Sequence, residues 1–153
     1  MKKVIIFGVE DFASLAHFYL KHDSEYEVVA FSLTKEYMTE DKLFEGLPIV
    51  EFDEIETLYY ANEYLFFAPL SPHGMNKLRE SIYNQIKDKG YEFISYVSSK
   101  VTLFPGVKIG DNCFILEDNT IQPYTEIGDN VILWSGNHIG HHSILKNHIF
   151  FAS

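Results

Sequence analysis

The sequence from Leu103 to Ser153 repeats every six residues, in blocks that read LFPGVK, IGDNCF, ILEDNT, IQPYTE, IGDNVI, LWSGNH, IGHHSI and LKNHIF, followed by FAS. Each block begins with an aliphatic or aromatic residue, and this series is Leu103, Ile109, Ile115, Ile121, Ile127, Leu133, Ile139, Leu145 and Phe151. The fifth residue is small, β-branched or amide-bearing, and this second series is Val107, Cys113, Asn119, Thr125, Val131, Asn137, Ser143 and Ile149.

A strict period of six indicates a coil of three short strands joined by tight corners, because helices repeat every 3.6 residues and strands every two. The first and fifth residues of each block then point inward. Gly-Asp-Asn and Glu-Asp-Asn suit the corners, since Gly and Asn tolerate positive φ. The repeat predicts a left-handed parallel β-helix over residues 99–153, with about three coils. An ordinary strand-rich domain with accidental spacing is the alternative.

Residues 1–98 lack this repeat and alternate between apolar strands and helical segments. The predicted strands are Lys3–Gly8, Tyr26–Ser32, Pro48–Glu51, Tyr64–Ala68 and Phe93–Val97. The predicted helices run from Phe12 to Lys21 with Asp11 as cap, from a capping box at Asp53–Glu56 to Tyr60, and from Ser71-Pro72 to Asp88 with Gly90 beyond it. This alternation predicts an α/β domain with a parallel sheet.

Composition narrows the classes of function. A hydrophobic content of 46% with 16% aromatic residues supports folded cores. No stretch is long and apolar enough for a membrane span, and the acidic residues soon after the first apolar run argue against a signal peptide. The net charge of −10 argues against nucleic acid and anionic membranes as partners. The single cysteine, Cys113, fits a reducing compartment, so we expect a cytoplasmic protein.

Five segments resemble the bacterial sugar acyltransferases that join a small Rossmann-like domain to a left-handed β-helix. These proteins include nucleotide-amino-sugar N-acetyltransferases and sialic acid O-acetyltransferase-like proteins. The segments are KKVIIFG, YEVVAFS, FEGLPIV, SYVSSKVTLFPGVKIGDN and LWSGNHIGHHSIL. They follow the family's order and cover nearly the whole chain.

The resemblance implies transfer of an acetyl group from acetyl-CoA to an amino or hydroxyl group of a nucleotide-linked amino sugar, for surface glycan synthesis and without a metal. It also implies a homotrimer with active sites between subunits, in which the Rossmann-like domain holds the nucleotide. CoA would lie in the groove between neighbouring β-helices. The general base falls on His141, and the residue that orients it falls on His142.

The chemistry of His141 suits that role independently. An acceptor amine or hydroxyl must lose a proton as it attacks the thioester, and a neutral imidazole can take it. His141 and His142 are the third and fourth residues of their block, which project outward at a corner. A solvated corner histidine is the plainer alternative. Asn137 and His138 are further candidates for substrate binding, although Asn137 also suits an inward amide ladder with Asn119. His138 also suits a surface or interface position, as does His148.

The nucleotide site is expected at the carboxyl ends of the predicted strands. Relatives often carry a glycine-rich turn after the first strand, but only Gly8 remains here, and Glu10 and Asp11 bring negative charge to this loop. The segments after the second and fourth strands, Ser32–Lys35 and Pro69–His73, are the other candidates. The predicted contacts are Gly8, Ser32, Thr34, Lys35 and Pro69.

Two other functions stay open. Histidines on a β-helix are also typical of trimeric γ-type carbonic anhydrases, which bind zinc between subunits. The repeat also stops inside a coil where the resembling enzymes continue, so we expect a C-terminally truncated chain. A non-catalytic remnant of such an enzyme is therefore the third candidate.

Overall fold

The computed structural model describes residues 1–72 and 77–152, and the chain divides into two compact units. The first unit comprises Met1–Ser71 and Ile82–Ile94, and the second comprises Pro72–Ser81 and Ser95–Ser153. The predicted domain ranges, 1–98 and 99–153, stay a prediction. The compact units differ from these ranges in two ways. The second unit includes residues 95–98, and it also includes the earlier segment Pro72–Ser81.

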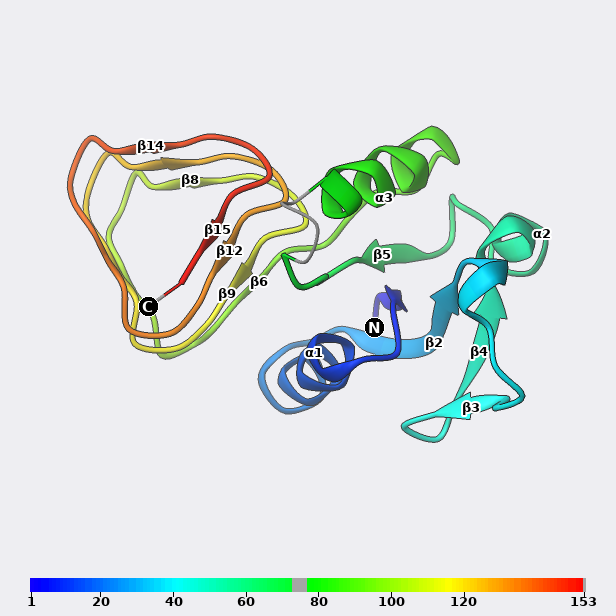
Figure 1. Ribbon diagram of the computed structural model, residues 1–153. Helices are drawn as coiled ribbons and strands as arrows, with labels where there is room; N and C mark the ends of the chain where they lie inside the picture. The colour runs from blue at the N-terminus through cyan, green and yellow to red at the C-terminus, as the bar shows by residue number, and fades with distance from the viewer. Residues whose placement is uncertain (73–76, 153) are drawn as a thin grey trace. The chain divides into compact units, whose positions relative to one another are not determined.

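The first unit is built on a five-stranded sheet of order β3-β4-β2-β1-β5 (Figure 1). Its parallel strands are β1 (Lys3–Phe7), β2 (Glu27–Leu33), β4 (Leu47–Glu51) and β5 (Leu65–Phe67). The short β3 (Leu43–Phe44), which the sequence analysis does not predict, pairs antiparallel with β4. Strand β1 lies at the centre of the order between β2 and β5, and its Val4, Ile5 and Ile6 are fully buried, as expected for a strand covered on both faces.

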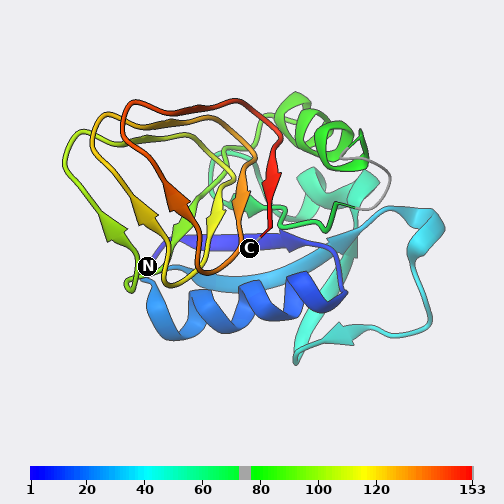
Figure 2. The same cartoon turned by 60° about the vertical axis from the view of Figure 1, so that its left-hand side comes forward.

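In the described parts of the chain, the helices are α1 (Asp11–Asp23), α2 (Ile55–Leu58) and α3 (Lys77–Asp88), with 3-10 turns η1 (Lys35–Tyr37) and η2 (Phe52–Glu54). Helix α1 runs alongside β1 and β2 (Figure 2). The predicted cap at Asp11 is wrong, because Asp11 is the first helical residue and Glu10 stands at the N-cap without a side-chain cap bond. An acidic first turn still favours the helix dipole.

Two other helix predictions need correction. The capping box predicted at Asp53–Glu56 is absent, since this segment forms η2 and a single turn of α2 without a side-chain cap. The start predicted at Ser71-Pro72 borders residues 73–76, which lie outside the described residues, and the described helix begins at Lys77. Gly90 follows α3 with φ +94, as predicted for the residue beyond the helix.

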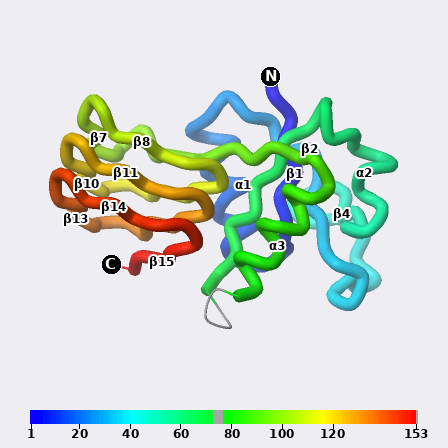
Figure 3. Tube along the Cα trace, turned by 90° about the horizontal axis from the view of Figure 1, so that it is seen from above, coloured from blue at the N-terminus to red at the C-terminus, as the bar shows by residue number. Residues whose placement is uncertain are grey.

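The second unit contains three parallel sheets of two-residue strands, of order β13-β10-β7, β14-β11-β8 and β15-β12-β9-β6. Figure 1 shows the triangular path of the chain, and Figure 3 shows the stacked coils. The strands are β6 (Tyr96–Val97), β7 (Thr102–Leu103), β8 (Lys108–Ile109), β9 (Phe114–Ile115), β10 (Thr120–Ile121), β11 (Glu126–Ile127), β12 (Ile132–Leu133), β13 (His138–Ile139), β14 (Ile144–Leu145) and β15 (Phe150–Phe151). Partners such as Ile121 and Ile139 are 18 residues apart, which confirms the predicted coil.

The last predicted strand, Phe93–Val97, is wrong. Phe93 forms an isolated bridge with Phe66 of the first unit, whereas Tyr96–Val97 is the first strand of the β-helix and pairs with Phe114–Ile115. Val97 stands six residues before Leu103, so the repeat begins one block earlier than the sequence analysis places it.

The interior of the β-helix is lined by first and fifth residues of the blocks, as predicted, except that Leu103 and Phe151 are 45% and 39% exposed. Its buried members are Cys113, Ile115, Ile121, Ile127, Val131, Leu133 and Ile139, and its partly buried members are Val97, Val101, Val107, Ile109, Leu145 and Ile149. The fourth residue of each block from residue 106 onward forms a corner with positive φ, at Gly106, Asn112, Asp118, Tyr124, Asn130, Gly136, His142 and His148.

The glycines of the two Gly-Asp-Asn corners serve another purpose than the predicted one. Gly110 and Gly128 are not among the positive-φ residues. A Cβ on Gly110 would overlap the carboxylate of Asp129, and a Cβ on Gly128 would overlap the amide oxygen of Asn147. These glycines therefore let adjacent coils approach closely.

Candidate active site

His141 and His142 lie together at an exposed corner of the β-helix, as the sequence predicts. The Nδ1 atoms of the two rings are 2.9 Å apart, at hydrogen-bond distance. The rings are nearly perpendicular, with centroids 5.2 Å apart and an interplanar angle of 89°. His142 has φ +61, which is the conformation of the corner position. The two histidines therefore form a dyad whose outer edges face away from the coil.

The hydrogen bond of this dyad limits its protonation. Of the two Nδ1 atoms, one must carry a proton and the other must accept it. If His141 donates, its Nε2 keeps a lone pair and can accept a proton from a substrate. If His142 donates instead, His141 in its neutral form carries its proton on Nε2 and cannot act as a base. Only the first arrangement gives His141 the predicted role.

Residues of the preceding coil contact the dyad through two hydrogen bonds and one ring stack. The backbone N–H of His141 donates to Oε1 of Gln122 at 3.2 Å, and that of His142 donates to the carbonyl of Pro123 at 3.2 Å. The ring of Tyr124 stacks on His142 with centroids 5.0 Å apart and an angle of 28°. The sequence analysis misses Gln122 and Tyr124. Their signal is the coil length, because Tyr124 stands one coil before His142.

Asn137 and His138 are placed differently. The backbone N–H of Asn137 donates to Oδ1 of Asn119 at 2.9 Å, and its Nδ2 donates to the carbonyl of Trp134 at 3.0 Å. Asn137 thus belongs to the amide ladder with Asn119 that its inward position predicts, and its side-chain N–H is engaged within the β-helix. His138 on β13 is exposed and can face a ligand. Trp134 stacks on Phe150 at 6.5 Å.

A second corner of the β-helix holds a buried polar cluster that the sequence analysis misses. Arg79 of α3 is only 2% exposed. Its guanidinium donates to the carbonyl and Oδ1 of Asn130 at 2.8 and 3.3 Å, and to the carbonyl of His148 at 3.4 Å. Burial lowers the pKa of Arg79 to about 10. Arg79 thereby satisfies backbone carbonyls at two positive-φ corners.

The orientation of His148 follows from this cluster. Oδ1 of Asn130 accepts from Arg79 and from Nδ2 of Asn112 at 2.9 Å, so the Nδ2 group of Asn130 faces Nδ1 of His148 at 2.8 Å. Nδ1 of His148 must therefore accept, and its Nε2–H points to Glu80 Oε1 at 3.4 Å. The sequence analysis expects a surface or interface residue here, but both ring nitrogens contact groups of the same unit.

In the first unit, the carboxyl ends of the strands bring several predicted contacts together. The backbone N–H of Gly8 donates to the carbonyl of Ser32 at 2.9 Å, and a Cβ on Gly8 would lie 3.5 Å from Leu70, just after Pro69. The hydroxyls of Ser32 and Thr34 are buried without a hydrogen-bond partner among the described residues. Such hydroxyls can bind polar groups of a ligand. Lys35 is exposed in η1, and Pro69 is buried.

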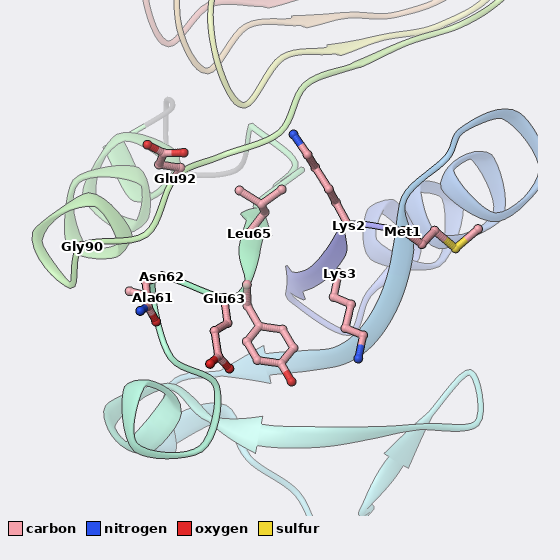
Figure 4. Close-up of a pocket in the computed structure, with 10 residues that line it drawn as sticks. Met1, Lys2, Lys3, Ala61, Asn62, Glu63, Leu65, Gly90 and Glu92 are labelled. Carbon is pink, nitrogen blue, oxygen red and sulfur yellow. The ribbon is translucent and has the colours of Figure 1, made fainter.

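The first unit also has a hollow away from these residues. It measures about 840 Å³ and is lined by charges of both signs, from Lys2, Lys3, Glu63 and Glu92 (Figure 4). These residues surround the amino ends of β1 and β5, at the opposite edge from Gly8. None of the predicted site residues lines it.

Two further properties bear on function. No group of three or more His, Cys, Asp or Glu residues within 1–72 and 77–152 is arranged to hold a metal ion. In the same ranges, no helix has the length and apolar character needed to cross a membrane.

Residues 106–148 match the bacterial transferase hexapeptide family (six repeats). No curated protein sequence matches the chain significantly. The acetyltransferase domain of PglB from Neisseria gonorrhoeae, also solved with acetyl coenzyme A, matches at TM-score 0.82 and 15% identity over 99% of this chain and 71% of that one. PerB from Caulobacter crescentus, solved with CoA and GDP-perosamine, matches at TM-score 0.73 and 18% identity, over 96% of this chain and 64% of that one. WeeI from Acinetobacter baumannii matches at TM-score 0.75 and 12% identity, over 98% and 69%.

At these identities the likeness establishes the fold alone. The parallel sheets and the hexapeptide match fit the left-handed β-helix of acetyltransferases, as predicted. The assignment of the α/β unit as Rossmann-like stays a prediction. The chain spans 64% of the length of the Caulobacter protein.

Proposed function

We propose that this chain is an acetyltransferase that moves an acetyl group from acetyl-CoA to the amino group of a nucleotide-linked amino sugar. The observation that carries the proposal is the exposed His141–His142 dyad on a hexapeptide β-helix. A fold shared with proteins solved with acetyl coenzyme A or with CoA and GDP-perosamine supports it. An amine is preferred to a hydroxyl as acceptor, because the Caulobacter protein is described as a perosamine N-acetyltransferase.

In this proposal His141 donates its Nδ1–H to His142 and keeps Nε2 unprotonated. The acceptor nitrogen adds to the thioester carbonyl while Nε2 of His141 takes its proton. As the carbon–sulfur bond breaks, the His141 imidazolium returns this proton to the sulfur, and CoA leaves as the thiol. His142 holds the imidazole in the required tautomer and stabilises the imidazolium that forms. The thioester is already activated, so the step requires neither a metal nor a covalent enzyme intermediate.

The nucleotide is assigned to the carboxyl edge of the first sheet, with Gly8, Ser32, Thr34, Lys35 and Pro69 as its contacts. Ligands of parallel sheets bind at this edge, and the buried hydroxyls of Ser32 and Thr34 offer hydrogen bonds there. The exposed acidic residues at the start of α1 disfavour a phosphate beside that helix. The phosphates are therefore assigned to the side of Lys35, and His138 is a contact for the sugar.

We also propose a homotrimer with active sites between subunits, working in surface glycan synthesis in the cytoplasm. Histidines that point away from their own coil can serve a substrate held partly by a neighbouring copy. Light scattering on the purified chain tests the assembly, since a monomer that turns over substrate would contradict it.

The decisive experiment is release of thiol from acetyl-CoA with a panel of nucleotide-linked amino sugars. The wild type should respond to one sugar, and His141→Asn should lower kcat by about 10²–10⁴, as expected for loss of a general base. His148→Asn is the matched control, because it changes a histidine of the same β-helix at a corner with other partners, and it should retain kcat. A folded wild type that releases thiol with no sugar of the panel, or equal loss in both variants, would contradict the proposal.

A further inference from the structure

Tyr124 occupies a corner to which a tyrosine is poorly suited. Its φ is +62, in the left-handed region where bulky side chains crowd the backbone. Gly106 stands at the equivalent position one coil earlier, and Asn112 and Asn130 stand at other corners. The side chain of Tyr124 is 65% exposed, so it contributes little to the core. Backbone conformation and core packing therefore give no reason for an aromatic ring here, and strain of this kind is typical of functional positions.

Among residues 1–72 and 77–152, the ring contact of Tyr124 is with His142 of the dyad. Its ring lies against His142 in a stacked arrangement, at 5.0 Å and 28°. His142 is exposed and bonded to His141 through Nδ1. An exposed imidazole that lacks a packed neighbour rotates about its side-chain bonds, and rotation breaks a hydrogen bond that needs one nitrogen in one direction. The stack restricts this rotation.

We propose that Tyr124 is a positioning residue that acts on His141 through His142. Its ring holds the plane of the His142 imidazole so that Nδ1 accepts the Nδ1–H of His141. Free histidine prefers the tautomer with its proton on Nε2, which cannot act as a base at that atom. The bond to His142 therefore has to hold His141 in its less common tautomer, and a loosely held His142 would fail to do so. This inference rests on the acetyl transfer proposed above.

The test compares Tyr124→Asn with Tyr124→Phe. Asn accepts positive φ but removes the ring, whereas Phe keeps the ring and removes only the hydroxyl. Tyr124→Asn should lower kcat about tenfold while KM changes less than about twofold, because in this proposal Tyr124 acts through His142 and not by binding the acceptor or CoA. Its thermal midpoint should stay equal or rise, since the left-handed strain is relieved. Tyr124→Phe should restore kcat.

Nitrogen NMR of histidine-labelled protein gives a second readout, which does not depend on turnover. In the wild type, Nε2 of His141 should show the shift of an unprotonated nitrogen, and in Tyr124→Asn it should move toward that of a protonated one. If the wild type lacks acetyl transfer, the proposed function fails, and the shift still decides the role of Tyr124. An unchanged shift together with unchanged kcat in Tyr124→Asn would overturn the inference. So would a loss in Tyr124→Phe as large as in Tyr124→Asn, or a fall in thermal midpoint that accounts for the lost activity.

Discussion

His142 and His148 occupy the same position in consecutive blocks, and their backbones are alike, with φ of +61 and +65. Their surroundings differ. Asn130 contacts Nδ1 of His148, and Glu80 contacts its Nε2. The buried Arg79 donates to the carbonyl of the same residue. His142 instead meets a neighbouring histidine and the face of an exposed tyrosine. The repeat thus fixes the backbone of a corner, while the residues around it decide whether its side chain is held by the same unit, as at His148, or left exposed, as at His142.

The largest effect is expected on kcat, from removing the imidazole of His142 at the exposed corner. His142→Gly tolerates the positive φ and removes the imidazole, so kcat of the proposed transfer should fall about 10²-fold as His141 loses its tautomer partner. The free energy of unfolding, measured in urea, should not fall. His142→Asn is the matched variant, because its amide oxygen can accept the Nδ1–H of His141, and it should retain more activity. Equal losses in the two variants would show that accepting this hydrogen bond is not the role of His142.

The buried interior of the β-helix should limit the stability of the protein at alkaline pH, because it contains the thiol of Cys113. Burial raises the pKa of the Cys113 thiol from 9.0 to about 11. The folded state then holds this proton more tightly than the unfolded state, so the contribution is complete below pH 9 and is lost as the pH rises through about 11. The loss amounts to about 2–3 kcal/mol.

Cys113→Val tests this limit, since Val131 fills the equivalent position one coil later. Urea titrations between pH 8.5 and 11 (roughly the range over which an ordinary and a buried thiol ionise) should show a shallower decline for the variant than for the wild type. Parallel declines would show that another group controls alkaline stability.

A smaller effect is expected on the free energy of unfolding, from removing the buried guanidinium of Arg79. Arg79→Met keeps most of the aliphatic stem and leaves the carbonyls of Asn130 and His148 without the guanidinium, which should cost about 2 kcal/mol of unfolding free energy. Glu80→Gln is the control, since it keeps a hydrogen-bond acceptor for His148. Denaturant unfolding of both variants makes the comparison. A stability of Arg79→Met equal to that of the wild type would mean that water replaces the guanidinium without cost.

The coil could be predicted because its period is local. Inward and corner positions follow from counting by six, and Val97 was missed only because counting began at Leu103. Counting by 18 would also have paired Tyr124 with His142, as it paired Asn119 with Asn137. The antiparallel β3 was missed although Glu45-Gly46, both with positive φ, mark a tight turn before β4.

The rest of the site depends on contacts that no local count supplies. Arg79 reaches Asn130 across 51 residues and His148 across 69, so its burial depends on how the start of α3, residues 77–81, packs within the second unit. The bond between His141 and His142 depends on side-chain rotation, which adjacency in sequence leaves open. At the carboxyl edge of the first sheet, strand ends predicted the meeting of Gly8 and Ser32, but not that the Ser32 hydroxyl would lack a partner among the described residues.

Gly110 and Gly128 also limit which substitutions the surface of the β-helix can accept. Because Asp129 and Asn147 fill the space that a Cβ would take, each glycine depends on a polar side chain of the next coil. Substitutions should therefore be coupled along the stack and nearly independent around the coil. A substitution that introduces a new side chain at one corner therefore has to fit the residues at the same corner of the coils above and below. It should have little effect on the other corners of its own coil.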